Sequence, residues 1–347
     1  GFISLGLINE EVGYYDQAIY HFDSAINILD LLGDNQKLVQ VFNNIGNVYN
    51  ILNDLEQSYN YYQKALNLAE NENLELEAVK TSSNLVEVLF SLKDYDRILR
   101  ILKNNLDFFS ANHDLYGTVL TLLKFGKVYY HLGEGYYDQA HNYLNDTLAL
   151  IKRIDAQLSR ATKARLEWEC FLYIAKLNIL WDNDNEAEDY LLKSLEIIRT
   201  YEIQDHINEA LVLENIANFH SIKGDDKKAI EYFMLAIEIY TKYGNKVKIA
   251  EIQKEIGTIF KEYIQDIEKA KTFFESALEI YEAEHYFKQS ATILQILGDI
   301  FTKENNLDLA KTFYEKASKY YSEINDEYNN SIITQKLKSL LEFKKDS

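Results

Sequence analysis

The chain has 347 residues, of which 55 are acidic and 36 are basic, so its formal net charge at pH 7 is −19. A nucleic acid needs a basic face that releases counterions, so this charge argues against direct binding of DNA or RNA. A content of 47% hydrophobic and 26% charged residues excludes a disordered chain. No apolar run reaches the length of a bilayer span, so we expect no membrane segment.

Cysteine, proline and methionine usage add three expectations. Cys170 is the only cysteine, which excludes an internal disulfide and fits a reducing, cytoplasmic location. The chain contains no proline, which suits an all-helical protein because proline breaks helix interiors. The first residue is not methionine, and the only methionine is Met234, so we expect the sequence to be a fragment of a longer protein.

A pattern of small and aromatic residues recurs along the chain and predicts eight helical hairpins. The clearest copies have a small residue, an aromatic three residues later and a short polar turn, followed by a small-aromatic-small stripe with the spacing i, i+4, i+7, and the copies centred on Val86 and Ala175 are weaker. In chain order the copies are anchored at Gly6, Gly46, Val86, Gly126, Ala175, Ala217, Gly257 and Gly298. The period is about 40 residues, with one longer interval between residues 126 and 175.

The residue types explain how such hairpins would stack. The small residue lets a neighbouring helix approach closely, and we expect the aromatic three residues later to fill the space beside it. A hairpin cannot bury its apolar face alone, so we predict an all-α array of eight hairpins over residues 1–327, which makes about seventeen helices together with the capping helix that follows. Residues 328–347 carry apolar residues at helical spacing and predict a capping helix and tail. The first helix is expected to be shortened.

The interval from 126 to 175 holds about nine extra residues. The run from Leu148 to Trp168 contains apolar residues separated by charges, which predicts lengthened helices. We therefore expect the curvature of the array to change here.

This pattern resembles the tetratricopeptide repeat (TPR) family, as in Gly298, Phe301, Ala310, Tyr314 and Ala317. The chain differs from that family in lacking its proline and in having a longer period than the family's usual one. It is similar to the longer-period variant in bacterial quorum-sensing receptors of the Rap, PlcR and NprR group. The resemblance implies a right-handed superhelix whose concave face, lined by the first helix of each hairpin, holds a peptide.

The sequence lacks the common motifs of catalysis, phosphate binding and metal binding. It contains no Walker loop, no His-Glu-x-x-His motif and no Gly-x-Ser-x-Gly elbow. The cluster Gly133-Glu134-Gly135 is interpreted as a turn. His131, Glu134, Asp138 and His141 lie on either side of that turn, so a metal site is disfavoured. We therefore expect no enzyme activity, no metal and no cofactor.

If the small anchor is repeat position 8, positions 2, 5, 6, 9, 12 and 13 should face a ligand. An asparagine amide can donate to and accept from an extended peptide backbone, and a lysine can bind its carboxylate. The lysines interrupt an acidic region, because the first 120 residues carry 17 acidic and 7 basic side chains. The candidate peptide-binding residues are Asn43, Asn44, Asn47 and Asn50 in hairpin two, Lys80, Asn84 and Glu87 in hairpin three, Lys124, Lys127, Tyr130 and His131 in hairpin four, and Asn215 and Asn218 in hairpin six.

Two functions remain open from the sequence. The first is a sensor of a regulatory peptide in a cytoplasmic bacterial signalling protein. The second is a scaffold portion of a larger protease, kinase or transcription activator that binds a protein segment. Asparagine is frequent throughout the chain, so chance placement of these amides on one face is the alternative to a peptide site. Self-association into a homo-oligomer is left open.

Overall fold

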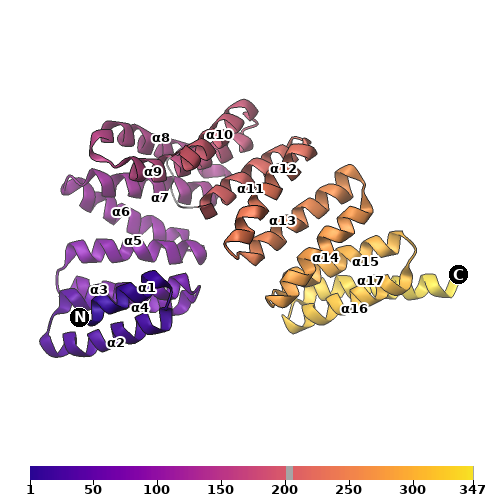
Figure 1. Ribbon diagram of the computed structural model, residues 1–347, viewed down its shortest axis with the longest axis horizontal. Helices are drawn as coiled ribbons and strands as arrows, with labels where there is room; N and C mark the ends of the chain where they lie inside the picture. The colour runs from indigo at the N-terminus through magenta and orange to yellow at the C-terminus, as the bar shows by residue number, and fades with distance from the viewer. Residues whose placement is uncertain (201–205, 347) are drawn as a thin grey trace. The chain divides into compact units, whose positions relative to one another are not determined.

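The structure is a computed structural model that describes residues 1–200 and 206–346, with side chains described up to residue 340. Over these residues it contains α-helices and short 3-10 and π turns but no strand (Figure 1). The predicted all-α array of helical hairpins is therefore confirmed. The seventeen α-helices of the described residues are α1 (Phe2–Val12), α2 (Tyr15–Leu32), α3 (Asn35–Ile51), α4 (Leu55–Asn71), α5 (Glu75–Ser91), α6 (Tyr95–Ala111), α7 (Leu115–Leu132), α8 (Tyr137–Arg153), α9 (Arg160–Leu180), α10 (Asp184–Thr200), α11 (His206–Ile222), α12 (Asp226–Lys242), α13 (Lys246–Ile259), α14 (Ile267–Ala283), α15 (Phe287–Lys303), α16 (Leu307–Glu323) and α17 (Glu327–Asp346).

The chain divides into two compact units, Gly1–Leu177 and Asn178–Ser347. The first unit holds α1 to α8 and most of α9, and the second holds the rest. Within each unit a helix packs mainly on its neighbours in sequence, and α1 and α5 also contact α3. This division falls inside α9 and was not predicted from the repeat pattern.

The regular part of the array, from α3 to α6, consists of helices of 17 residues. Short turns of equal length join them, and the middle residue of each turn has a left-handed backbone, with φ between 55° and 59° at Asn53, Asn73, Lys93 and His113. The last residue of the turn usually caps the next helix: Asp54 accepts from Gln57 N at 3.0 Å, and Asp114 accepts from Gly117 N at 2.8 Å. Each repeat therefore consists of two half-repeats of equal length.

Each glycine anchor lies against an aromatic or leucine side chain of the second helix of its hairpin. A β-carbon built on Gly46 would lie 2.7 Å from Tyr62 Cε1, and one on Gly298 would lie 2.5 Å from Tyr314 Cε1. The expectation that the aromatic three residues after the anchor fills this space was wrong. Tyr49 instead stacks on Tyr61, with ring centroids 5.6 Å apart.

The long interval between hairpins four and five differs from the prediction. Helix α8 keeps the usual 17 residues, and only α9 is lengthened, to 21 residues. The run from Leu148 to Trp168 is broken by a 3-10 turn at Asp155–Gln157, after which Ser159 accepts a hydrogen bond from Thr162 N at 3.1 Å. This serine caps the start of α9, so the run is divided between two helices, of which one has the usual length where both were expected to be longer. The expected change of curvature remains a prediction.

A one-residue insertion explains a π turn in hairpin seven. The interval from the anchor Gly257 to Gly298 is one residue longer than the interval from Ala217 to Gly257. Helix α13 ends in a π turn at Phe260–Ile264, followed by Gln265 with φ 62°. A π turn accommodates one extra residue in a helix, so the following hairpin keeps its phase.

The two ends of the array differ. Helix α17 packs on α16 and contributes buried Ile333 and Leu340, as expected of a capping helix, and it begins one residue before the predicted Tyr328. Helix α1 has 11 residues, which agrees with the predicted shortened first helix.

Candidate functional site

Polar side chains from α3, α5, α7 and α9 form several groups of contacts between successive first helices of the first unit. Most of the contacts join residues about one repeat apart, so each helix meets the next at nearly equivalent repeat positions. Gln36 Nε2 donates to Glu77 Oε1 at 2.6 Å, and Lys124 Nζ donates to the Ser83 carbonyl at 2.8 Å. We call this set the polar row, and its members are Gln36, Asn43, Asn47, Glu77, Ser83, Asn84, Glu87, Lys124, Lys127, Glu169 and Tyr173.

Three of the predicted asparagines meet in the polar row. Asn84 Nδ2 lies 3.2 Å from Asn43 Oδ1 and 3.4 Å from Asn47 Oδ1. The Tyr62 hydroxyl donates to the same Asn47 oxygen at 2.6 Å. Asn44 and Asn50 are half-buried on the same helix. The amides therefore satisfy one another across α3 and α5, and a peptide backbone would have to replace these bonds.

The predicted lysines of α7 are paired with carboxylates. Lys124 Nζ lies 2.8 Å from Glu87, and Lys127 Nζ lies 2.6 Å from Glu169, and these lysine side chains are only 19% and 18% exposed. Burial favours the neutral amine, but the Glu169 carboxylate outweighs it and raises the pKa of Lys127. Both lysines are thus already paired with carboxylates, whereas Lys80 is exposed on α5.

Tyr130 and His131, also predicted to bind the peptide, lie in an aromatic cluster beside Lys127. The Tyr130 ring meets Tyr173 edge to face at 5.3 Å, and the His131 ring stacks on Tyr95 at 6.1 Å. Lys127 Nζ lies 5.9 Å from the Tyr173 ring centroid. Burial raises the pKa of Tyr173 to about 12, so its hydroxyl stays protonated and can donate.

In the second unit the two predicted asparagines have different environments. The Asn215 amide donates to the Leu211 carbonyl of its own helix at 2.7 Å. Asn218 is exposed and lines a hollow of about 500 Å³ between α11, α13 and α15. The other lining residues are Glu214, Phe233, Glu251, Ile252, Lys254, Glu255, Tyr281 and Gln289.

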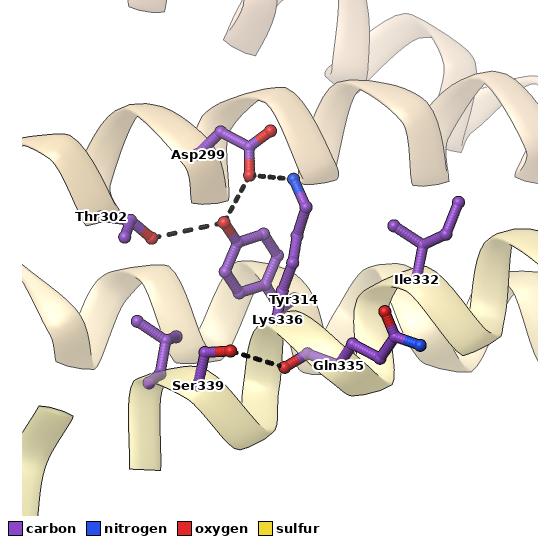
Figure 2. Close-up of a pocket in the computed structure, with 8 residues that line it drawn as sticks. Asp299, Thr302, Tyr314, Ile332, Gln335, Lys336 and Ser339 are labelled. Atoms are coloured by element: carbon purple, nitrogen blue, oxygen red, sulfur yellow. Dashed lines mark hydrogen bonds and ion pairs between the residues drawn. The ribbon is translucent and has the colours of Figure 1, made fainter. Parts of the chain in front are cut away.

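A second hollow, of about 350 Å³, lies between α15, α16 and α17 (Figure 2). Figure 2 shows Tyr314 and Lys336 both reaching the Asp299 carboxylate, which accepts from the Tyr314 hydroxyl at 2.5 Å. Thr302 contacts the same hydroxyl at 3.3 Å. This network ties α17 to α15 and α16 through polar contacts in addition to the apolar core.

Several residues of these surfaces were missed from the sequence although the repeat register contains them. With Ala175 as position 8, Glu169 and Tyr173 occupy positions 2 and 6 of hairpin five. With Gly257 as position 8, Glu251 and Glu255 occupy positions 2 and 6 of hairpin seven. Applying one register to every hairpin would have found them.

Three further observations concern the reactivity of the cysteine, metal binding and membrane insertion. Cys170 is fully buried, and burial raises the pKa of its thiol well above the ordinary value. Among the residues that the structure describes, no three His, Cys, Asp or Glu side chains lie close enough together to hold a metal ion. No helix in the described ranges combines the length and apolar character needed to cross a bilayer.

Two family models match parts of the chain. The model described as tetratricopeptide repeat matches residues 39–72, which contain α4 and most of α3. The model described as soluble NSF attachment protein, SNAP, matches residues 180–335, which lie in the second unit.

Individual proteins give similar results. The chain is 29% identical over 131 residues to a soluble NSF attachment protein homolog of fowlpox virus, and the match covers 38% of this chain and 45% of that protein. The chain thus spans less than half the length of this relative. Among solved structures, a Rap conjugation gene regulator of plasmid pLS20, in complex with the Phr* peptide, has a TM-score of 0.58 at 14% identity, covering 83% of this chain and 75% of that one. The apo form of the quorum sensor NprR from B. thuringiensis also has a TM-score of 0.58, at 12% identity, covering 97% and 86%.

Proposed function

The chain has a tetratricopeptide-repeat fold, and from this premise we propose that it is a non-enzymatic module that binds a short regulatory peptide in a cytoplasmic signalling protein. The observation that carries the proposal is the polar row, in which amides, lysines and carboxylates of four successive first helices meet on one face. The solved Rap regulator bound to the Phr* peptide supports it, because it shares this fold.

The amide part of the polar row suits the backbone of an extended peptide. Each asparagine offers a donor and an acceptor, and the bonds between Asn84 and Asn43 or Asn47 join side chains rather than buried main-chain groups. Exchanging these bonds for bonds to a peptide costs little, whereas deleting one amide leaves its partner unsatisfied at a cost of about 1–3 kcal/mol.

The lysine part of the polar row sets a condition on the ligand charge. A ligand carboxylate at Lys124 would have to displace Glu87, whose side chain is 47% exposed and can turn towards solvent. Lys127 is held more firmly, because its partner Glu169 is only 24% exposed. We therefore propose that Lys124 and the exposed Lys80 bind the ligand carboxylate. Lys127 would instead hold the neighbouring aromatic cluster in position.

The test is a titration of synthetic peptides of five to eight residues, with free and amidated C-termini, by isothermal calorimetry. The double variant Asn43→Ala, Asn84→Ala should lose about 5- to 150-fold in affinity, which corresponds to about 1–3 kcal/mol. Asn71→Ala, at an exposed position that ends α4, is the matched control and should bind like the wild type. If a peptide binds the double variant as tightly as the control, the amide assignment is wrong.

Binding of a protein segment is the second candidate, and the match of the second unit to the SNAP family favours it. Here the surface would be the hollow lined by Asn218, Glu251 and Glu255. Glu251→Lys with Glu255→Lys should then abolish partner binding in a pull-down while peptide titration remains unchanged. A loss of peptide binding in that variant would instead assign the peptide to the second unit.

A further inference from the structure

A buried tyrosine lies near the end of the second helix in each of the last three hairpins. Tyr240, Tyr281 and Tyr321 follow the second alanine of the stripe by four residues, and each is at most 2% exposed. The Tyr240 hydroxyl donates to Glu214 at 3.4 Å, and the Tyr321 hydroxyl lies 3.5 Å from Thr292 Oγ1. Among the residues that the structure describes, the Tyr281 hydroxyl has no hydrogen-bond partner. Because buried polar groups are normally hydrogen-bonded, this hydroxyl points to a partner outside the chain.

The surroundings of Tyr281 show where such a partner would lie. Tyr281 lines the hollow of about 500 Å³ between α11, α13 and α15. Burial raises the pKa of Tyr281, and the carboxylates of Glu251 and Glu255 on α13 raise it further. The hydroxyl is therefore protonated and lies near two carboxylates of the same hollow.

Two amides of the hollow are also available to a ligand. Asn218 occupies repeat position 9 of hairpin six, which corresponds to Asn47 in hairpin two. Asn47 accepts from the Tyr62 hydroxyl at 2.6 Å, but hairpin six has Phe233 in place of that tyrosine. Within residues 1–200 and 206–346, neither Asn218 nor Gln289 of α15 makes a side-chain hydrogen bond. The hollow thus offers amide oxygens in addition to the hydroxyl.

The charge of the hollow favours a cation. Its lining includes one ammonium, that of Lys254, and three carboxylates, those of Glu214, Glu251 and Glu255. Lys254 Nζ lies 2.8 Å from Glu255, and Lys248 Nζ lies 2.7 Å from Glu251, but these lysine side chains are 37% and 35% exposed and can turn towards solvent. Glu214 is only 18% exposed, and burial raises its pKa although Lys248 lies nearby. A cation that enters the hollow would therefore relieve a deficit of positive charge.

A guanidinium suits these groups better than an ammonium does. It presents five N–H donors in a planar fork, and its face can stack on an aromatic ring. The acceptors of the hollow are distributed over several helices and comprise carboxylates, amide oxygens and one hydroxyl. An ammonium is a compact charge with three donors, so it would reach fewer of them.

We propose that the hollow between α11, α13 and α15 binds an arginine side chain of a protein segment. The Tyr281 hydroxyl and the amide oxygens of Asn218 and Gln289 accept N–H groups of the guanidinium. The carboxylates of Glu251 and Glu255 balance its charge. This inference rests on the second candidate function, in which a protein segment occupies this hollow, and it names the side chain that the hollow recognises.

The probe is a blocked pentapeptide with one arginine between glycines, titrated into the isotopically labelled intact chain and followed by NMR. Backbone amide signals of α11, α13 and α15 should shift. The arginine peptide should bind at least tenfold tighter than a peptide with citrulline, which keeps the shape but loses the charge. It should also bind roughly threefold tighter than a peptide with lysine.

Matched variants locate the contact. Tyr281→Phe removes only the hydroxyl and should weaken the arginine peptide at least threefold without lowering stability in urea, because no bond within the chain is lost. Tyr321→Phe, at the same repeat position, is its control and should bind like the wild type. Glu251→Gln with Glu255→Gln should weaken binding at least tenfold. Glu275→Gln with Glu279→Gln, at exposed positions of equal spacing on α14, should leave binding unchanged.

The outcomes separate this proposal from the function on which it rests. Equal affinity for the arginine and citrulline peptides, with shifts in α11, α13 and α15, overturns the arginine assignment and leaves segment binding in place. Absence of shifts in these helices also overturns it, and the pull-down alone then decides the second candidate function. Wild-type affinity in both Tyr281→Phe and the Glu251→Gln, Glu255→Gln variant would show that the arginine binds elsewhere, which overturns the proposal too.

Discussion

Gly46 is the position where the helix packing can be tested most directly. Its missing side chain makes room for Tyr62, which is 1% exposed and donates to Asn47 at 2.6 Å. An added β-carbon would lie 2.7 Å from Tyr62 Cε1 and 2.8 Å from Cδ1, distances that real β-carbons do not show. The ring cannot move away without breaking its hydrogen bond and vacating a buried site.

Two effects oppose each other in Gly46→Ala. Alanine is favoured over glycine in a helix by about 1 kcal/mol, and overpacking a tight core costs about 1–3 kcal/mol. We expect a net loss of only about 1 kcal/mol for alanine, because hairpin six has an alanine, Ala217, at the same repeat position and buries it fully. Leucine adds three more carbons to the same space, so Gly46→Leu should lose about 3 kcal/mol.

Urea unfolding followed by circular dichroism in the far ultraviolet measures these losses. Gly135→Ala is the control, because a β-carbon there meets nothing within 4 Å and should change stability little. In a Tyr62→Ala background the added methyl of Gly46→Ala meets vacated space, so its penalty should vanish. Wild-type stability of Gly46→Leu, or an unchanged penalty in the Tyr62→Ala background, would refute this account of the packing.

Three further predictions concern other positions. Because burial raises the pKa of Cys170, its thiol should react with Ellman's reagent only at the rate of unfolding, and fast labelling of the native chain would contradict this. Burial and the Lys228 ammonium lower the pKa of His220, so the unfolded chain takes up its proton first. Stability should therefore fall as pH drops below about 6.5, and His220→Phe should lose less between pH 7 and pH 5; equal losses would count against it. Deleting Tyr263 from the π turn should cost less than about 1 kcal/mol because it restores the regular spacing, whereas deleting Asn50 from α3 should cost several times more; similar losses in urea unfolding would show that the π turn is not an insertion.

The fold could be predicted from the sequence because the same residue types recur at one period. Small residues are required wherever two helices approach closely. Gly46, Gly257 and Gly298 therefore each identify a hairpin without reference to the other copies. The role of each aromatic was harder to predict. The aromatic on the anchor's own helix and the one on the following helix can both lie beside an anchor, and only the tertiary packing selects Tyr62 over Tyr49.

The polar row was only partly predictable. The register placed Asn43, Asn47 and Asn84 on one face, and the structure brings them together. The register can place Glu169 on the ligand-facing side of hairpin five, but it could not show that Glu169 pairs with Lys127, because the irregular interval lies between the two residues. Ion pairing between helices depends on the length of the intervening segment, which a local pattern does not fix.

The equal half-repeats have a mechanical consequence. Because each hairpin meets mainly its neighbours, a force applied to the two chain ends should detach the hairpins one at a time. An extended residue spans about 3.3–3.6 Å, so each event should release roughly 130–145 Å of contour length. The sawtooth of force against extension should therefore have nearly uniform spacing, with a longer step where hairpin four gives way to the lengthened α9.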